Sequence, residues 1–379
     1  MNVRPADDVQ ARNHRLHALC PYFAMFPPAF ARESILAHTR PRDLVLDPFC
    51  GRGTALLEAL LTGRRAIGCD INPVAYCVSA AKVDAPSLRR VTDRLEVLRE
   101  RYARSPKFAF EGRRSALPDF FRRAYHAETL RQLLFLRGRL RWRTDAVDRF
   151  VTALLLGHLH GESSRSPSYL SNQMPHTISS KPGYSLRYWR ENNLRAPRRD
   201  VFMLLRDRGE FRLADGRPPL RGRAVRSDVR RAHEQLSDYR GRVSAVVTSP
   251  PYLDVTSFEE DQWLRLWLLG GPPHPTYGRV SRHDRHRSWD KYWHFLASSW
   301  RGIAPLLANR ATIVCRIGAR KRTEAEIQEA VIDSVQAVWP KACLISRPLR
   351  SSIRNRQTHV FHPGAAGCKF EIDFCFSVP

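Results

Sequence analysis

A glycine-rich loop follows a short apolar strand near the N-terminus of the sequence. The strand Leu44–Leu46 leads into the segment 47–54, which reads D-P-F-C-G-R-G-T. Glycines at the end of a parallel strand let the backbone turn sharply, and the next helix N-terminus offers free N–H groups to a ligand. The phosphate-loop pattern and the third glycine of the dinucleotide fingerprint are both missing. Asp70, 17 residues after Gly53, ends the next predicted strand, where a carboxylate can bind ribose hydroxyls. The loop therefore predicts a site for a nucleoside ligand without a pyrophosphate.

A second motif, T-S-P-P-Y at residues 248–252, follows the apolar strand Val243–Val247. Its two prolines stiffen the turn and remove backbone donors, so that carbonyl groups remain free to accept hydrogen bonds. Ser249 adds a hydroxyl acceptor, and Tyr252 adds an aromatic face on which a ring can stack. This combination suits a planar ring that carries an exocyclic amine. The alternative is a strand-ending turn with a buried tyrosine, but a glycine loop at a neighbouring strand end favours the binding site.

The elements around these motifs predict one α/β domain with an insertion. The strand 44–46, the helix Thr54–Leu61 and the strand Arg65–Cys69 form a βαβ unit. Helical periodicity then extends over 88–102, 128–140 and 145–159, and we expect the helices between Leu130 and Leu159 to be core rather than partner surface. The strand–helix rhythm resumes after residue 222, with strands at 224–228, 243–247 and 311–316, a helix at 259–269, and an alternating edge or hairpin strand at 368–376. The sequence thus predicts a mostly parallel sheet built from 1–82 and 222–379, interrupted by a helical and loop insertion at 83–221.

Charge is the outstanding feature of the composition. The 379 residues contain 63 basic and 37 acidic side chains, a net charge of +26, and all but seven of the basic residues are arginine. Arginine forks match phosphates and guanine edges, which favours a nucleic-acid partner; a GC-rich genome that encodes arginine freely is the alternative. No apolar run approaches the roughly 18 residues of a membrane span, and the N-terminus has no signal-peptide segment, so a cytoplasmic protein is expected. The eight cysteines form no C-x-x-C pair, so neither a metal site nor a disulfide framework is predicted.

Taken together, the motifs resemble those of the S-adenosylmethionine-dependent DNA amino-methyltransferases. The resemblance covers residues 20–30 (CPYFAMFPPAF), the glycine loop and the T-S-P-P-Y motif. It implies a Rossmann-like class I methyltransferase fold with S-adenosylmethionine as cofactor. The residues that it places around the methionine half of the cofactor are Phe26, Pro27, Asp47, Gly51, Gly53 and Thr54; Asp70 is placed at the ribose, Phe49 and Asp228 near the adenine. Ser249, Pro250 and Tyr252 would hold a flipped target base, with Pro251 in the same catalytic motif.

The serine form of the second motif is commonest among N4-cytosine enzymes, so the resemblance favours N4 methylation of cytosine in DNA. An N6-adenine enzyme, an RNA base-amine methyltransferase and a non-catalytic DNA-binding protein on the same fold remain alternatives. If 224–228 leads to the adenine contact, the insertion sits one element earlier than is usual in the family. A cognate restriction endonuclease is the further partner considered, and the sequence predicts no oligomeric state.

Two basic stretches are the predicted DNA contacts. Ser163–Arg199 combines arginines with tyrosines, Trp189, Asn172 and Gln173, and Arg279–Arg287 is a loop that also carries two histidines. A solvated helical cap is the alternative for the first stretch, and a plain solvated loop is the alternative for the second.

Overall fold

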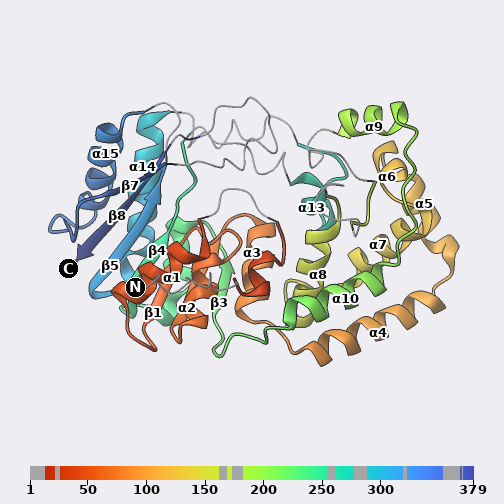
Figure 1. Ribbon diagram of the computed structural model, residues 1–379, viewed down its shortest axis with the longest axis horizontal. Coiled ribbons are helices and arrows are strands. Elements are labelled where there is room, and N and C mark those ends of the chain that lie inside the picture. The colour runs from red at the N-terminus through yellow and green to blue at the C-terminus, as the bar shows by residue number, and fades with distance from the viewer. Residues whose placement is uncertain are drawn as a thin grey trace, which may run out of the picture.

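An eight-stranded, mostly parallel sheet lies on one side of the computed structural model, and a group of helices lies on the other (Figure 1). The structure describes residues 13–21, 26–161, 169–172, 182–253, 262–276, 288–318, 322–352, 368 and 370–379. The strands are β1 Leu44–Asp47, β2 Arg65–Asp70, β3 Arg223–Arg226, β4 Val243–Thr248, β5 Leu307–Ile317, β6 Cys343–Leu344, β7 Leu349–Ser352 and β8 Phe370–Val378.

The sheet has the order β3-β2-β1-β4-β5-β8-β6, with β7 pairing β8 off this path. Strands β1 to β5 are parallel to their neighbours, and β8 runs antiparallel to β5. Carboxyl ends of parallel strands meet at one edge of a sheet, where ligands bind in open α/β folds. The glycine loop after β1 and the T-S-P-P-Y motif at the end of β4 therefore lie at neighbouring strand ends. This arrangement confirms the predicted Rossmann-like methyltransferase fold.

The longer helices fall into two groups that cover the sheet and one group that extends beyond it. The helices are α1 Pro28–His38, α2 Thr54–Leu61, α3 Pro73–Val83, α4 Leu88–Arg104, α5 Glu111–Ser115, α6 Asp119–Ala124, α7 Ala127–Arg139, α8 Ala146–His158, α9 Pro182–Glu191, α10 Val201–Leu213, α11 Ala232–Gln235, α13 Trp263–Leu268, α14 Trp289–Ile303 and α15 Glu324–Gln336. One core contains α1 and α2 with the β1 side chain Val45, and another contains α14 and α15 with Leu44 and Leu46. Successive side chains of β1 therefore face opposite helical layers.

Helices α4, α6 to α10 and α13 form a separate hydrophobic core, which also includes buried residues of α3. In Figure 1, α3 lies between this helical group and the sheet. The periodic segments predicted as helices appear as α4, α7 and α8, and their apolar faces are buried, as expected. Helix α13 belongs to this core although it follows the predicted boundary at residue 221. The helical core therefore includes residues from outside the predicted insertion. The division at residues 82 and 221 stays a prediction.

Two local expectations need correction. The alternating C-terminal segment is not at the edge of the sheet, because β8 pairs with β5 on one side and with β6 and β7 on the other. Part of the basic stretch 163–199 is also better packed than its composition indicated. Within it, α9 buries Trp189, whose ring lies 5.5 Å from that of Phe120. Asn172 is buried as well, and its side chain donates a hydrogen bond to the Arg123 carbonyl at 2.7 Å.

Candidate active site

The two sequence motifs meet through a buried hydrogen bond. The Thr248 hydroxyl, at the end of β4, donates to Asp47 Oδ1 at the end of β1, with an oxygen–oxygen distance of 2.7 Å. Strands β1 and β4 are direct parallel neighbours, so their last residues lie side by side. Phe49 N–H donates to the same Asp47 oxygen at 3.2 Å. The other carboxylate oxygen, Oδ2, accepts no hydrogen bond from the described part of the chain. The glycine loop and the S-P-P-Y turn are thus fixed relative to each other.

The glycine loop is held against the end of β2 by Asp70. Its carboxylate accepts hydrogen bonds from the N–H groups of Gly51 and Asn72, both at 2.9 Å. Gly53 has a φ of +74°, and a Cβ atom there would lie only 3.0 Å from Ser79 in α3. Only glycine therefore allows this loop to turn so close to α3. Thr54, the first residue of α2, is buried directly after the turn.

Burial raises the pKa of both carboxyl groups at this edge. The pKa of Asp47 rises from 3.8 to about 7, and that of Asp70 to about 6, because desolvation disfavours the charged forms. Neither group forms an ion pair within the part of the chain that the structure describes. S-adenosylmethionine carries an ammonium and a sulfonium group as well as one carboxylate, so two carboxyls without a cationic partner fit its cationic groups. Asp47 would bind the ammonium through the free Oδ2, and Asp70 has acceptor capacity left for the ribose hydroxyls.

The S-P-P-Y turn leads into a polar chain that ends on β8. The Ser249 hydroxyl donates to Tyr252 Oη at 3.3 Å, and Tyr252 Oη donates to Glu371 Oε1 at 2.7 Å. Burial and the negative charge of Glu371 raise the pKa of Tyr252 well above its usual value, so the phenol keeps its proton. Because the Ser249 proton points to Tyr252, the serine lone pairs are left to accept from a ligand.

An arginine on β5 connects this polar chain to the N-terminal motif. Arg316 forms a bidentate ion pair with Asp373 at 2.6 and 2.7 Å, and it lies 3.6 Å from Glu371. Its guanidinium also lies 3.8 Å from the centre of the Phe30 ring. Phe30 packs edge-on against the buried Phe26 at 5.3 Å. Pro27, between them in sequence, caps the N-terminus of α1. All three sequence blocks therefore converge at this edge of the sheet.

The two residues expected near the adenine have other contacts. Asp228, beyond the end of β3, caps the short helix Val229–Arg231 and binds the Arg230 guanidinium, with a shortest contact of 2.6 Å. Phe49 is partly buried, with its ring 6.1 Å from that of Phe295 in α14. The Ser227 N–H donates to the Asp70 carbonyl at 3.2 Å, which keeps this corner beside β2. The role of Phe49 and Asp228 at the adenine stays a prediction.

Parts of the predicted DNA contacts lie outside the described residues, namely 162–168, 173–181 and the whole of Arg279–Arg287. In the described part of the first stretch, Tyr184 is half exposed and Arg190 pairs with Asp119 at 2.8 Å. The burial of Trp189 and Asn172 removes these two side chains from the expected DNA-reading surface. None of the helices in the described ranges has the length and apolarity required to cross a membrane.

The sequence interpretation missed Glu371, Arg316 and Asp373. A signal for the two acids was present, since they alternate with apolar residues in F-E-I-D-F and must share one face of the strand. Nothing local indicated that this face meets Tyr252, which precedes Glu371 by 119 positions.

The sheet order, with the two motifs at neighbouring strand ends, is that of a Rossmann-like methyltransferase fold. Residues 5–81 match the family model described as DNA methylase, which confirms the resemblance to the N4/N6 amino-methyltransferases. Proteins of this family use S-adenosylmethionine as methyl donor, in agreement with the carboxyl groups of Asp47 and Asp70 at the site.

Similar proteins act on more than one kind of nucleic acid. The Type II methyltransferase M.MjaII of Methanocaldococcus jannaschii is 28% identical over 80 residues, 21% of this chain and 15% of that protein. The tRNA (guanine(10)-N2)-dimethyltransferase of the same organism is 52% identical over 46 residues, 12% and 13% of the two chains. The DNA adenine methyltransferase YhdJ of Escherichia coli is 38% identical over 61 residues, 16% and 21%. The matches thus span about a fifth or less of these relatives.

Proposed function

We propose that this protein is a DNA methyltransferase that transfers a methyl group from S-adenosylmethionine to the exocyclic N4 amine of a flipped cytosine. The observation that carries the proposal is the Thr248–Asp47 hydrogen bond, because it joins a methyl-donor site to an amine-accepting turn. The serine at position 249 favours cytosine N4 through the family resemblance. The cognate restriction endonuclease and a cytoplasmic location belong to this proposal, as does the binding of DNA rather than RNA.

The chemistry requires an activated amine. An exocyclic amine is a poor nucleophile because its lone pair is delocalised into the ring. The cofactor supplies an electrophilic methyl group on a sulfonium. Ser249 Oγ and the Pro250 carbonyl would accept the two N–H bonds and aim the nitrogen lone pair toward the methyl-donor site. Tyr252 would stack against the ring, and the polar turn would stabilise charge that develops on the nitrogen. The target base must leave the duplex, at a cost of a few kcal/mol.

The product must lose a proton, and the structure offers an acceptor. As the C–N bond forms and the C–S bond breaks, the nitrogen gains positive charge and carries one excess proton. The chain from Ser249 through Tyr252 ends on the Glu371 carboxylate, so each hydroxyl can pass one proton and receive another. Glu371 would then hold the proton until solvent removes it. No nucleophilic cysteine is needed in this scheme.

Two other substrates have support. The similarity to YhdJ favours N6 methylation of adenine, and the similarity to the tRNA dimethyltransferase favours RNA. The test is incubation of the protein with methyl-labelled S-adenosylmethionine and separate DNA and RNA pools, followed by digestion to nucleosides. We expect the label in N4-methylcytosine from DNA. Label only in N6-methyladenine would move the proposal to adenine, and label only in RNA would refute DNA as the substrate.

A further inference from the structure

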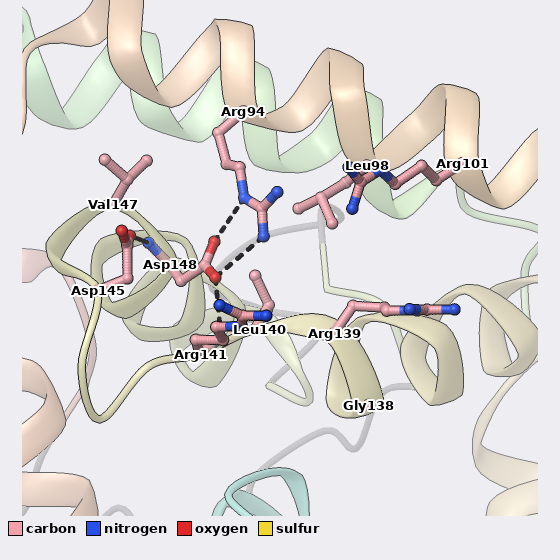
Figure 2. A pocket seen from close by; sticks show the side chains of 10 residues that line it. All are labelled: Arg94, Leu98, Arg101, Gly138, Arg139, Leu140, Arg141, Asp145, Val147 and Asp148. Atoms are coloured by element: carbon pink, nitrogen blue, oxygen red, sulfur yellow. Dashed lines mark hydrogen bonds and ion pairs between the residues drawn. The ribbon is translucent and has the colours of Figure 1, made fainter.

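A cavity of about 550 Å³ lies among α4, α7 and α8, outside the candidate active site (Figure 2). Leu98, Leu140 and Val147 contribute its apolar lining. Guanidinium groups surround this lining, and Figure 2 shows them arriving from α4 and from the connection between α7 and α8. The size is in the range of ligand sites, and it exceeds what a single phosphate ion would fill.

The carboxylate of Asp148, which lines the cavity, already has a cationic partner. Arg94 forms a bidentate ion pair with the buried Asp148 at 2.7 and 3.0 Å, and Arg141 N–H donates to the same carboxylate at 2.8 Å (Figure 2). Asp145 accepts from the Asp148 N–H as the N-cap of α8. Because Asp148 is already paired with Arg94, its carboxylate does not neutralise the other arginines of the cavity.

Three exposed arginines remain around the cavity, and no described carboxylate pairs with them. They are Arg101, Arg139 and Arg141. Three other exposed arginines of α4 have acidic partners on the same helix. These pairs are Arg89–Asp93, Arg99–Glu96 and Arg104–Glu100. The positive charge at the cavity is thus available to a ligand, whereas Arg89, Arg99 and Arg104 of α4 have acidic partners.

A second hollow of about 290 Å³ adjoins the first and shares Leu140 and Arg141 with it. Arg143 and the segment 268–270 at the end of α13 also line it. Arg137 ties the two sides together, because it donates to the Trp267 carbonyl at 2.8 Å. Two adjoining hollows with a shared arginine suit a linear chain of anionic groups better than a compact anion.

The hollows lie toward the carboxyl end of the parallel strands. Trp142, next to Arg141, packs against Tyr76 with ring centres 6.1 Å apart. Tyr76 belongs to the first turns of α3, which begins at Pro73, directly after β2 ends at Asp70. A ligand in the hollows would therefore approach the end of the sheet that holds the candidate active site.

We infer that Arg101, Arg139 and Arg141 bind consecutive phosphates in the backbone of the nucleic-acid substrate, with a sugar against Leu140. The inference rests on the proposed function, because it assigns a new binding site for the same substrate. Backbone contacts of this kind provide affinity and register without reading sequence.

The test compares two triple variants of the full-length protein. In the first, Arg101→Gln, Arg139→Gln and Arg141→Gln are combined; in the control, Arg89→Gln, Arg99→Gln and Arg104→Gln remove the same charge from α4. Binding of a labelled DNA duplex is measured by fluorescence anisotropy between 50 and 200 mM salt. We expect the cavity variant to raise Kd at least tenfold and to reduce the salt slope by about 2 to 3, since each phosphate contact contributes roughly 0.9. The control should stay within about threefold of wild type.

Further measurements separate the explanations. Thermal unfolding and S-adenosylmethionine binding should be unchanged in both variants. Equal losses of DNA affinity in both variants would overturn the inference, since they would indicate a general charge effect. The inference would also be overturned if the cavity variant lost saturable binding of inorganic phosphate but kept its affinity for DNA. If wild-type protein binds neither DNA nor RNA, the proposed function fails as well.

Discussion

Tyr252 and Glu371 share a hydrogen bond of 2.7 Å that joins the S-P-P-Y turn to the C-terminal strand β8. Glu371 lies on the polar face of β8 together with Asp373, while the opposite face of β8 is buried in the core. The C-terminal strand thus supplies a carboxylate to a site whose recognisable motifs all precede residue 253. Through this bond, β8 contributes a side chain to the candidate active site as well as a strand to the sheet.

Replacing Glu371 by Gln should lower kcat by about 100-fold, because an amide cannot accept the proton that methyl transfer releases. KM for DNA and Kd for S-adenosylmethionine should change less than about threefold. Single-turnover methyl transfer measures the effect, and Glu371→Asp should recover part of it. Asp373→Asn is the matched control on the same strand face. It removes the ion pair with Arg316. We therefore expect a clear loss of thermal stability and only a small loss of kcat. A normal kcat for Glu371→Gln would remove the residue from the mechanism.

Ser249→Ala and Asp70→Ala should separate turnover from cofactor binding. Loss of the Ser249 hydroxyl removes an acceptor for the target amine, so kcat should fall about 10- to 100-fold with cofactor affinity nearly intact. Loss of the Asp70 carboxylate should weaken cofactor binding first, by about tenfold or more. Calorimetric titration with S-adenosylmethionine and steady-state kinetics check both. Unchanged turnover in Ser249→Ala would contradict the assigned role of that hydroxyl.

Cofactor affinity should rise with pH between 6 and 7.5. Burial raises the pKa of Asp47 to about 7, and only its ionised form attracts the cofactor ammonium strongly. The ionised fraction grows about five- to tenfold over this interval, and the association constant should follow. Asp47→Asn should flatten the profile.

Stability of the free protein should show the opposite trend. A carboxyl whose folded pKa lies above its unfolded value of 3.8 stabilises the fold below that value, and the contribution is lost as pH rises toward 7. Asp47→Asn should therefore lose less stability between pH 4 and 7, as measured by urea unfolding. If the affinity of the wild-type protein for S-adenosylmethionine stayed constant between pH 6 and 7.5, the role assigned to Asp47 would be contradicted.

Two glycines with nearly equal backbone angles allow a matched test of the loop. Gly53 and Gly63 have φ values of +74° and +77°, but only a Cβ at Gly53 would meet Ser79, at 3.0 Å. Gly63→Ala should cost about 1 to 2 kcal/mol, the penalty of the left-handed conformation. Gly53→Ala should cost about 1 kcal/mol or more beyond this and should weaken cofactor binding. Urea unfolding and calorimetry check the pair, and equal costs would show that the approach to Ser79 is not restrictive.

Local patterns were sufficient for much of the fold. The strand, loop and helix from Leu44 to Leu61 are specified by neighbouring residues, so β1 and α2 appear where the sequence predicted them. The helical periodicity of 128–140 and 145–159 was equally reliable, because the apolar residues of an amphipathic face recur every three or four positions along the sequence.

The missing parts depend on contacts between distant residues. Alternation in 368–376 correctly indicated a strand, but it could not show that β8 has neighbours on both sides. The aromatic and basic composition around Trp189 suggested an exposed surface, yet packing against Phe120 buries that ring. The bond between Tyr252 and Glu371 likewise follows from the pairing of β8 with β5. Strand pairing over such separations has no local signature.

The parallel pairing of β1 with β4 also constrains how the protein is made. Thr248 and Asp47 are 201 positions apart, so β1 has no partner on this side until most of the chain has been synthesised. At about 5 to 20 residues per second, the delay is roughly 10 to 40 seconds on a ribosome. The helical group α4 to α10 emerges entirely within that interval. An apolar strand edge is thus exposed during synthesis, and early compaction of these helices against α3 would shorten the time in which the nascent chain is open to aggregation.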